Sequence, residues 1–220
     1  MSQSSLKPAN RQFAVYLGLF VTTWAGYVLL VYRHVQALGE ASFAYAATNI
    51  CVRLMIWVAP VFLMLKVVDR TAPLRALGLV DNWKRGVLVG LGLSTLLLVL
   101  PLLRFGWPHS IGRNITWNSV LSTSLGIGFF EEIPFRGFIL QKFQTRMNFW
   151  LANALTSLVF VSLHLPGWFR LHLFTPSLTL NIFALSFVWG MVFRCSRSLW
   201  SCVISHSASD FISFVLFHGR

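Results

Sequence analysis

Acidic residues are scarce in this chain of 220 residues, which contains only six Asp and Glu. Charged residues of both signs make up 11% of the sequence, whereas a soluble domain averages about 25%. Hydrophobic residues make up 56%, and the mean hydropathy is +0.68. This composition excludes an ordinary water-soluble globule. It also excludes intrinsic disorder, which requires few apolar groups and many charges.

Cysteine and glycine are also sparse. The three cysteines show no CxxC spacing and no even-numbered pattern, so a disulfide-stapled fold is excluded. We expect Cys51, Cys195 and Cys202 to be small buried hydrophobic residues. The 15 glycines are too few for a collagen repeat. The class that remains is a polytopic membrane protein.

Most of the chain consists of long apolar runs. They cover approximately residues 13–32, 44–65, 86–103, 117–141, 149–165, 178–193 and 199–217. Only helices and closed barrels satisfy their backbone in lipid, and these runs are too long and continuous for barrel strands. The sequence therefore predicts an all-α transmembrane bundle of about seven to eight helices in a single integral-membrane domain, 1–220. The eighth helix would be a short or re-entrant segment near 106–116.

The basic residues give the predicted orientation. The 18 Lys and Arg stand singly between apolar runs, whereas nucleic-acid-binding proteins cluster them, so no nucleic-acid partner is expected. A cytoplasmic N-terminus and seven spans follow the positive-inside rule, and the partner at the surface is membrane lipid. The cytoplasmic side then receives Lys7, Arg11, Lys66, Arg70, Arg75, Lys84, Arg85, Lys142, Arg146, Arg194 and Arg197, and the other side receives Arg33, Arg104, Arg113, Arg170 and Arg220. The short loops suggest a prokaryotic cytoplasmic membrane.

Three of the six acids lie in or beside apolar runs. A charge at the bilayer centre costs about 2.5–3.5 kcal/mol even on the lenient insertion scale, so such residues are functional candidates. Glu132 and Arg136 are four residues apart with the acid first, the favourable order for a helical ion pair. Glu131 points about 100° away from Glu132 and lacks that partner. Glu131 is therefore the candidate general base, with a packing ion pair as the simpler interpretation of the segment.

Two further motifs place histidines inside apolar runs. Glu131 and His164 lie at similar separations from a turn near residues 147–148, so an antiparallel hairpin would bring them to one depth. In the last run, His206 and Asp210 lie on one polar helix face, which must face the bundle interior or a wet cavity. Each motif alone is also compatible with interhelical hydrogen bonding. Arg53, inside the second run, either snorkels or pairs with a carboxylate, and it receives no role.

The three motifs together resemble the CPBP family, the CAAX-processing and bacteriocin-processing (Abi) intramembrane proteases. The pattern is EExxxR at Glu131, Glu132 and Arg136, FxxxH at Phe160 and His164, and HxxxN/D at His206 and Asp210. The resemblance covers residues 120–215, the expected catalytic core. It implies an endopeptidase in which Glu131 activates water, His164 helps to hold that water, His206 and Asp210 stabilise the oxyanion, and Glu132 with Arg136 supports the site. The substrate would be a membrane-anchored or hydrophobic peptide or protein.

One departure concerns the last motif residue, which is most often Asn in this family and is Asp210 here. An ionised Asp cannot donate to an oxyanion, so Asp210 is either protonated or an acceptor that orients His206, and we favour the second. Glu131, Glu132, His164 and His206 could also form a zinc shell, but HExxH is absent and the resemblance favours a metal-free glutamate mechanism without cofactor. The alternatives are the zinc-dependent protease, a non-enzymatic peptide-binding immunity protein, and, ranked last, a proton- or ion-coupled transporter.

Overall fold

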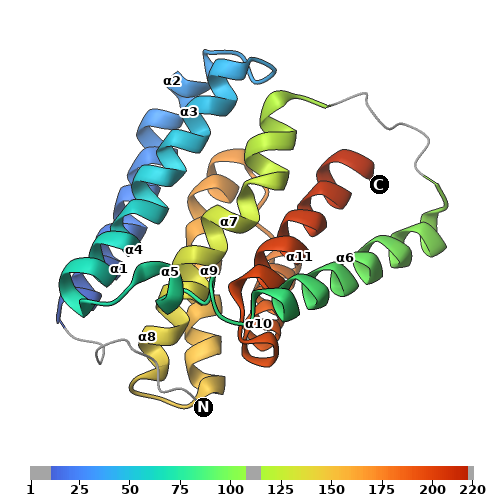
Figure 1. The fold of residues 1–220 in the computed structure, drawn as a ribbon. Coiled ribbons are helices and arrows are strands. Elements are labelled where there is room, and N and C mark those ends of the chain that lie inside the picture. Colours follow the sequence, from blue (N-terminus) through green and yellow to red (C-terminus); the bar gives the residue numbers. More distant parts are fainter. Residues whose placement is uncertain (1–10, 108–114, 218–220) are drawn as a thin grey trace.

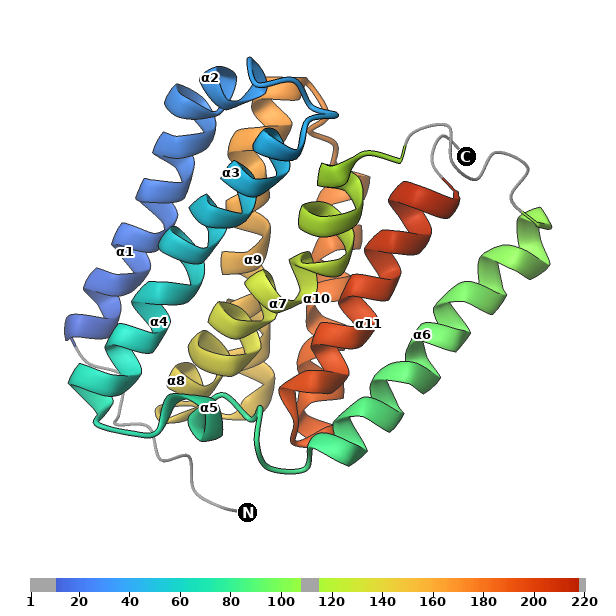
Figure 2. The same cartoon turned by 45° about the horizontal axis from the view of Figure 1, so that its top comes forward.

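The computed structural model describes residues 11–107 and 115–217, and every regular element in this part is a helix (Figure 1). Within it, six helices are long and apolar enough to cross a membrane: Arg11–Gln36, Phe43–Asp69, Trp83–Phe105, Phe149–Leu171, Pro176–Ser196 and Leu199–Leu216. They run between two ends of one bundle, as Figure 2 shows. The predicted all-α, polytopic class is confirmed. The segment expected near 106–116 falls mostly on residues outside the described part.

The labelled elements follow the predicted runs. The first helix comprises α1 (Arg11–Gly26), η1 (Tyr27–Val31) and α2 (Tyr32–Gln36), and the second comprises α3 (Phe43–Arg53), η2 (Leu54–Val58), α4 (Ala59–Leu63) and η3 (Met64–Asp69). The short α5 (Pro73–Ala76) leads to α6 (Trp83–Phe105), and the last three helices are α9 (Phe149–Leu171), α10 (Pro176–Ser196) and α11 (Leu199–Phe211) with η6 (Ile212–Leu216). The Asn148 side chain accepts a hydrogen bond from the Leu151 amide (3.0 Å) and fixes the start of α9.

The run predicted at 117–141 forms the central segment of the bundle. It comprises η4 (Asn118–Leu125), α7 (Ile127–Glu132), η5 (Ile133–Ile139) and α8 (Leu140–Gln144). This segment holds Glu131, Glu132, Arg136 and Lys142, all buried. A π-type turn interrupts it where the Gly126 amide donates to the Leu121 carbonyl (3.0 Å), and such turns often occur at functional sites. The most charged apolar run is therefore the one that the other helices surround (Figure 1).

Aromatic side chains fill the space between α1 and the central segment. Tyr16 meets Phe138 edge to face at 5.1 Å between ring centroids, and Phe20 meets Phe135 at 5.9 Å. Phe135 in turn contacts Phe160 of α9 at 4.8 Å. These pairs add about 0.5–1.5 kcal/mol each to the burial of their rings, so they fix how η5 lies against α1 and α9.

Side-chain contacts hold the helices together at each end of the bundle. At one end, the Lys142 ammonium pairs with the Asp69 carboxylate (2.5 Å), and the Trp200 indole donates to the Leu79 carbonyl (2.9 Å). At the other end, the Arg170 guanidinium donates to the Gln36 side chain. The basic residues predicted on the cytoplasmic side thus gather at the first end. Lys7, Arg113 and Arg220 lie outside the described residues.

The prediction for the cysteines is wrong at two positions. Cys202 is buried, as expected, but Cys51 and Cys195 are exposed on the outside of the bundle. In a membrane protein the outer surface of a spanning helix faces lipid, so a small apolar side chain is stable there without being buried in protein.

Candidate active site

The motif residues of α7 and α11 meet in the interior of the bundle. Glu131, Glu132 and His206 are 5%, 0% and 3% exposed, respectively. Close approach of the two helices makes this possible: a Cβ at Gly128 would collide with the Val203 carbonyl oxygen. The Ser207 hydroxyl adds a hydrogen bond from α11 to the Leu125 carbonyl (2.9 Å). The two carboxylates are therefore held against the histidine by backbone packing.

Glu132 forms the predicted ion pair with Arg136. The Arg136 Nη1 donates to Glu132 Oε1 at 2.9 Å, and both side chains are fully buried. The second guanidinium nitrogen, Nη2, donates to the carbonyl oxygen (2.6 Å) and the hydroxyl (2.7 Å) of Ser186 on α10. A buried ion pair is stable only when such additional hydrogen bonds satisfy it. This pair therefore ties η5 to α10.

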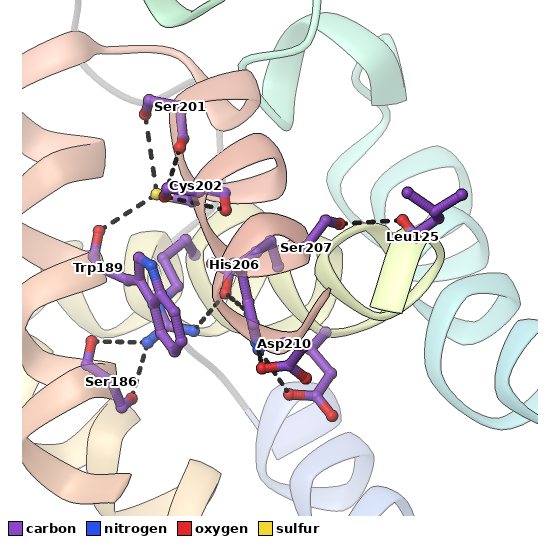
Figure 3. A network of polar contacts seen from close by, with 12 residues as sticks. Leu125, Ser186, Trp189, Ser201, Cys202, His206, Ser207 and Asp210 are labelled. Carbon is purple, nitrogen blue, oxygen red and sulfur yellow. Dashed lines mark hydrogen bonds and ion pairs between the residues drawn. The ribbon is translucent and has the colours of Figure 1, made fainter. Parts of the chain in front are cut away.

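His206 contacts both carboxylates of α7. Its Nδ1 lies 2.6 Å from Glu132 Oε1, and its Nε2 lies 3.7 Å from Glu131 Oε2. The ring stacks on the Trp189 indole with centroids 3.9 Å apart and planes 19° apart, as Figure 3 shows from close by. Because Glu132 Oε1 also accepts from Arg136, it acts as the acceptor toward His206, so Nδ1 carries a proton and Nε2 is the nitrogen directed toward Glu131.

Asp210 lies one turn beyond His206 on the same face (Figure 3). Its Oδ1 is 4.0 Å from His206 Nε2, which is too long for a hydrogen bond. The imidazole instead donates its orienting hydrogen bond to Glu132, a residue for which the sequence predicted only the ion pair with Arg136. A single carboxylate oxygen, Oε1, accepts from both Arg136 and His206. The role predicted for Asp210, as the acceptor that orients His206, is therefore not supported by a hydrogen bond.

His164 lies on α9 and is half-buried. Its Nδ1 is 2.9 Å from the Phe160 carbonyl oxygen, which can only accept, so Nδ1 carries the proton and Nε2 is free to accept. The Phe160 ring lies between the histidines, 4.9 Å from His164 and 6.2 Å from His206. Within the described residues no hydrogen bond or ion pair joins His164 to Glu131.

Sequence reasoning missed the residues that support the site from α10. Ser186 holds the Arg136 guanidinium, and Trp189 stacks on His206. The buried Cys202 thiol donates to the Trp189 carbonyl (3.2 Å), and Asn153 of α9 donates to the Phe187 carbonyl (2.8 Å). Ser186 and Trp189 lie in an apolar run that contains no local motif. Only the packing of α10 against α9 and α11 reveals them.

Arg53 extends from the second helix toward the site. Its Nη1 donates to the carbonyl and hydroxyl oxygens of Ser122, both at 2.8 Å, and its guanidinium lies 5.9 Å from the Trp57 ring centroid. No carboxylate lies within ion-pair distance of it in the described part of the chain. As to metals, residues 11–107 and 115–217 contain no group of three or more His, Cys, Asp or Glu placed to hold an ion.

One of three comparisons with known proteins found a family match. Residues 113–212 match the family model of the type II CAAX prenyl endopeptidase Rce1-like proteins, and this segment contains all three motifs. Neither the comparison with curated proteins nor that with solved structures found a match. On the family match, residues 113–212 form an Rce1-like CAAX endopeptidase domain, of a family of proteases, in a chain with six helices long and apolar enough to cross a membrane.

Proposed function

We propose that the protein is an intramembrane endopeptidase that hydrolyses a peptide bond of a membrane-associated protein or peptide, with Glu131 as the general base. The observation that carries the proposal is the position of His206 between Glu131 and Glu132 in a buried site. A lone packing ion pair between Glu132 and Arg136 would need neither the second carboxylate nor the histidine. Hydrolysis by a water that Glu131 activates would use both the second carboxylate and the histidine.

Glu131 is the acid of α7 without an arginine partner in the described residues. Its carboxylate would take a proton from a water molecule, whose hydroxide adds to the carbonyl carbon of the peptide bond. When the tetrahedral intermediate collapses, the C–N bond breaks and the same proton passes from Glu131 to the leaving nitrogen. The products are a carboxylic acid and an amine. A positioned general base contributes roughly 10²–10⁴ in rate.

His206 would supply the charge that stabilises the oxyanion. With Nδ1–H donated to Glu132, Nε2 can donate only when the ring is an imidazolium. Glu132, Glu131 and Asp210 surround the ring with three carboxylates, which favours that form. Asp210 would thus act through its charge. Removing one such donor typically costs about 10²–10³ in kcat.

His164 would position the attacking water. Its Nε2 can accept a hydrogen bond because Nδ1–H is directed at the Phe160 carbonyl. A water held between this nitrogen and Glu131 would have both protons engaged and a lone pair directed at the substrate. Glu131, His164, His206 and Asp210 would then be the catalytic residues, with Glu132 and Arg136 as positioning residues. This mechanism requires no metal ion.

The membrane arrangement is part of the same proposal. The end of the bundle that carries Lys66, Arg70, Lys142, Arg146 and Arg194 would face the cytoplasm, by the positive-inside rule. The chain would lie in a prokaryotic cytoplasmic membrane, with the substrate entering from the bilayer.

The test compares cells that express the wild type with cells that express Glu131→Gln, which keeps the shape and removes the base. Quantitative proteomics of membrane peptides should show a substrate that stays uncut with Glu131→Gln and is cut by the wild type. Glu40→Gln, an exposed acid outside the site, is the control. Retained cleavage in Glu131→Gln would contradict Glu131 as the general base. Cellular function retained in Glu131→Gln without any cleavage would favour a peptide-binding protein without catalysis. Inhibition by a chelator, reversed by zinc, would contradict the metal-free mechanism.

A further inference from the structure

The first two spanning helices form an apolar groove between them. The groove has a volume of about 520 Å³, with α1 as one wall and η2, α4 and η3 as the other. These elements lie side by side at one edge of the bundle (Figure 1, Figure 2). The volume falls within the range of about 300–1,000 Å³ that small-molecule sites occupy. The proposed mechanism uses none of the side chains that line this groove.

The floor of the groove is aromatic and its rims are exposed. Tyr16 and Phe20 line it and are buried, so they form the floor. Val15 and Leu19 on α1 and Leu63 on α4 line it with 52%, 60% and 63% of their surface exposed, so they form the rims. The groove therefore opens outward, on a face that lies against lipid in a membrane. Left empty, it would forfeit the dispersion contacts of its lining, so it favours an occupant with an apolar chain.

The groove is about as long as one leaflet of a bilayer is thick. Its α1 wall runs from Arg11 to Thr23, which at 1.5 Å per residue is about 18 Å along the helix axis. The hydrocarbon core of a bilayer is about 30 Å thick, so one leaflet contributes about 15 Å. Val68 lines the same end as Arg11 and directly precedes Asp69, whose ion pair lies at the basic end of the bundle (Figure 2). The groove thus follows one leaflet from its headgroups toward the midplane, as an acyl chain does.

Arg11 gives the headgroup end of the groove a positive charge. Among the described residues it is the one charged side chain of the lining, it is exposed, and it forms no ion pair there. The carboxylate of Asp69, at the same end, is buried and already paired with Lys142. A guanidinium binds a phosphate group through two parallel hydrogen bonds, and basic residues at a membrane surface attract anionic lipids. The two ends of the groove therefore fit an acyl chain and an anionic headgroup.

We propose that this groove binds one anionic phospholipid from the leaflet at the basic end, with an acyl chain between α1 and α4 and the phosphate at Arg11. The bound chain supports the aromatic layer beneath it. Tyr16 contacts Phe138 and Phe20 contacts Phe135, and both partners belong to η5 of the central segment. The lipid is therefore part of the packing that holds α1 against the bundle. The site lies apart from Glu131, so lipid binding tests it independently of the proposed protease activity.

The experiment measures lipid binding to the purified 220-residue chain in detergent by native mass spectrometry. The probes are dioleoyl phosphatidylglycerol and dioleoyl phosphatidylcholine, which share their acyl chains and phosphate, whereas only the first carries a net charge. We expect one phosphatidylglycerol per chain, bound about fivefold more tightly than phosphatidylcholine, because one cation near the headgroup contributes about 1 kcal/mol. Phosphatidylglycerol should also raise the unfolding temperature, since a ligand that binds only the folded state stabilises it.

Two kinds of variant separate the headgroup from the chain. Arg11→Gln should lower the affinity for phosphatidylglycerol about fivefold and remove the preference over phosphatidylcholine. Its control, Arg85→Gln, is exposed at the start of α6 on the other side of the bundle (Figure 2) and should keep the preference. Val15→Trp and Leu63→Trp fill the groove from opposite walls and should each lower the affinity for both lipids about tenfold, the effect of displacing two methylene groups. Leu88→Trp, exposed on α6, should not. Thermal unfolding checks that each variant is folded.

Several outcomes would overturn the proposal. They are equal binding of the two lipids to the wild type, no binding of either, equal effects of Arg11→Gln and Arg85→Gln, and unchanged binding in both tryptophan variants of the groove. A dimer that excludes phosphatidylglycerol would assign the groove to a second copy of the chain. Displacement of phosphatidylglycerol by a farnesylated cysteine would assign it to the tail of a substrate. A failure of the proposed protease activity would leave the lipid binding unchanged, so the two failures are distinguishable.

Discussion

Replacing Glu132 separates its contribution to stability from its contribution to catalysis. Its Oε1 accepts from Arg136 at 2.9 Å and from His206 at 2.6 Å, with no exposed surface on the Glu132 side chain. Glu132→Gln keeps the shape but leaves the Arg136 guanidinium as a buried charge without a counterion. Breaking a buried pair in this way costs about 3–5 kcal/mol, and the amide oxygen that remains sets the expected loss near the lower value.

The same substitution removes the charge that favours the His206 imidazolium. Nε2 then no longer donates to the oxyanion, and kcat should fall by about 10²–10³. The double variant Glu132→Gln with Arg136→Met has no buried charge at either position. Because a neutral pair of similar volume often restores the stability of a buried ion pair, we expect the unfolding temperature to return most of the way to that of the wild type. The activity should stay low.

The assay combines thermal unfolding in detergent with the rate of cleavage of the substrate identified in cells. Glu40→Gln serves as the control for loss of an exposed carboxylate. Recovery of both stability and activity in the double variant would refute the reasoning, because Glu132 would then act on the fold alone. Full activity in the single variant would refute it as well.

Three other substitutions test separate parts of the structure. His164→Ala should lower kcat by about 10²-fold. The unfolding temperature should change little, because His164 is half-buried and its one described hydrogen bond is to its own helix. A wild-type kcat would contradict the role of His164 in holding the water. Asp69→Asn should destabilise the protein by about 3–5 kcal/mol in thermal unfolding, because it removes the carboxylate that pairs with the buried Lys142. Its control, Asp81→Asn, removes the carboxylate of an exposed pair with Arg75 and should change stability by less than about 1 kcal/mol. Equal effects of the two substitutions would contradict the argument from burial. Gly128→Ala should lower the stability of the protein by about 1–3 kcal/mol and slow cleavage, because the added Cβ meets the backbone of α11. Its control, Gly92→Ala, has open space around the added Cβ and should change neither. An active and stable Gly128→Ala protein would show that α7 need not lie so close to α11.

Hydropathy predicted the helices well because membrane helices satisfy their own backbone hydrogen bonds. Each of the seven apolar runs lies within a helical stretch of the structure, and the pair of Glu132 with Arg136 follows from local helical spacing. The run at 117–141 differs from a plain span because its charges are stabilised by neighbouring helices and not by water or lipid. Its place at the centre of the bundle could have been inferred from those charges alone.

The tertiary partners could not be predicted in this way. The hydrogen bond from His206 to Glu132 joins residues 74 positions apart, and the contact of Arg136 with Ser186 joins residues 50 positions apart. A sequence motif records which residues are present and gives no information on which nitrogen meets which oxygen. The same limit explains why Asp210 was expected to orient His206 and why the pair of Arg53 with Ser122 was not foreseen.

The central claim is that Glu131 activates water in a site shared by three helices. Its most direct test is the cleavage rate of purified wild type and purified Glu131→Gln in proteoliposomes, measured by mass spectrometry in ¹⁸O-labelled water. If Glu131 is the base, the new carboxyl group gains one labelled oxygen and Glu131→Gln cleaves more slowly by about 10²–10⁴, with an unchanged unfolding temperature. A folded Glu131→Gln protein that cuts within about threefold of the wild-type rate would contradict it, since the loss of a general base cannot be so small.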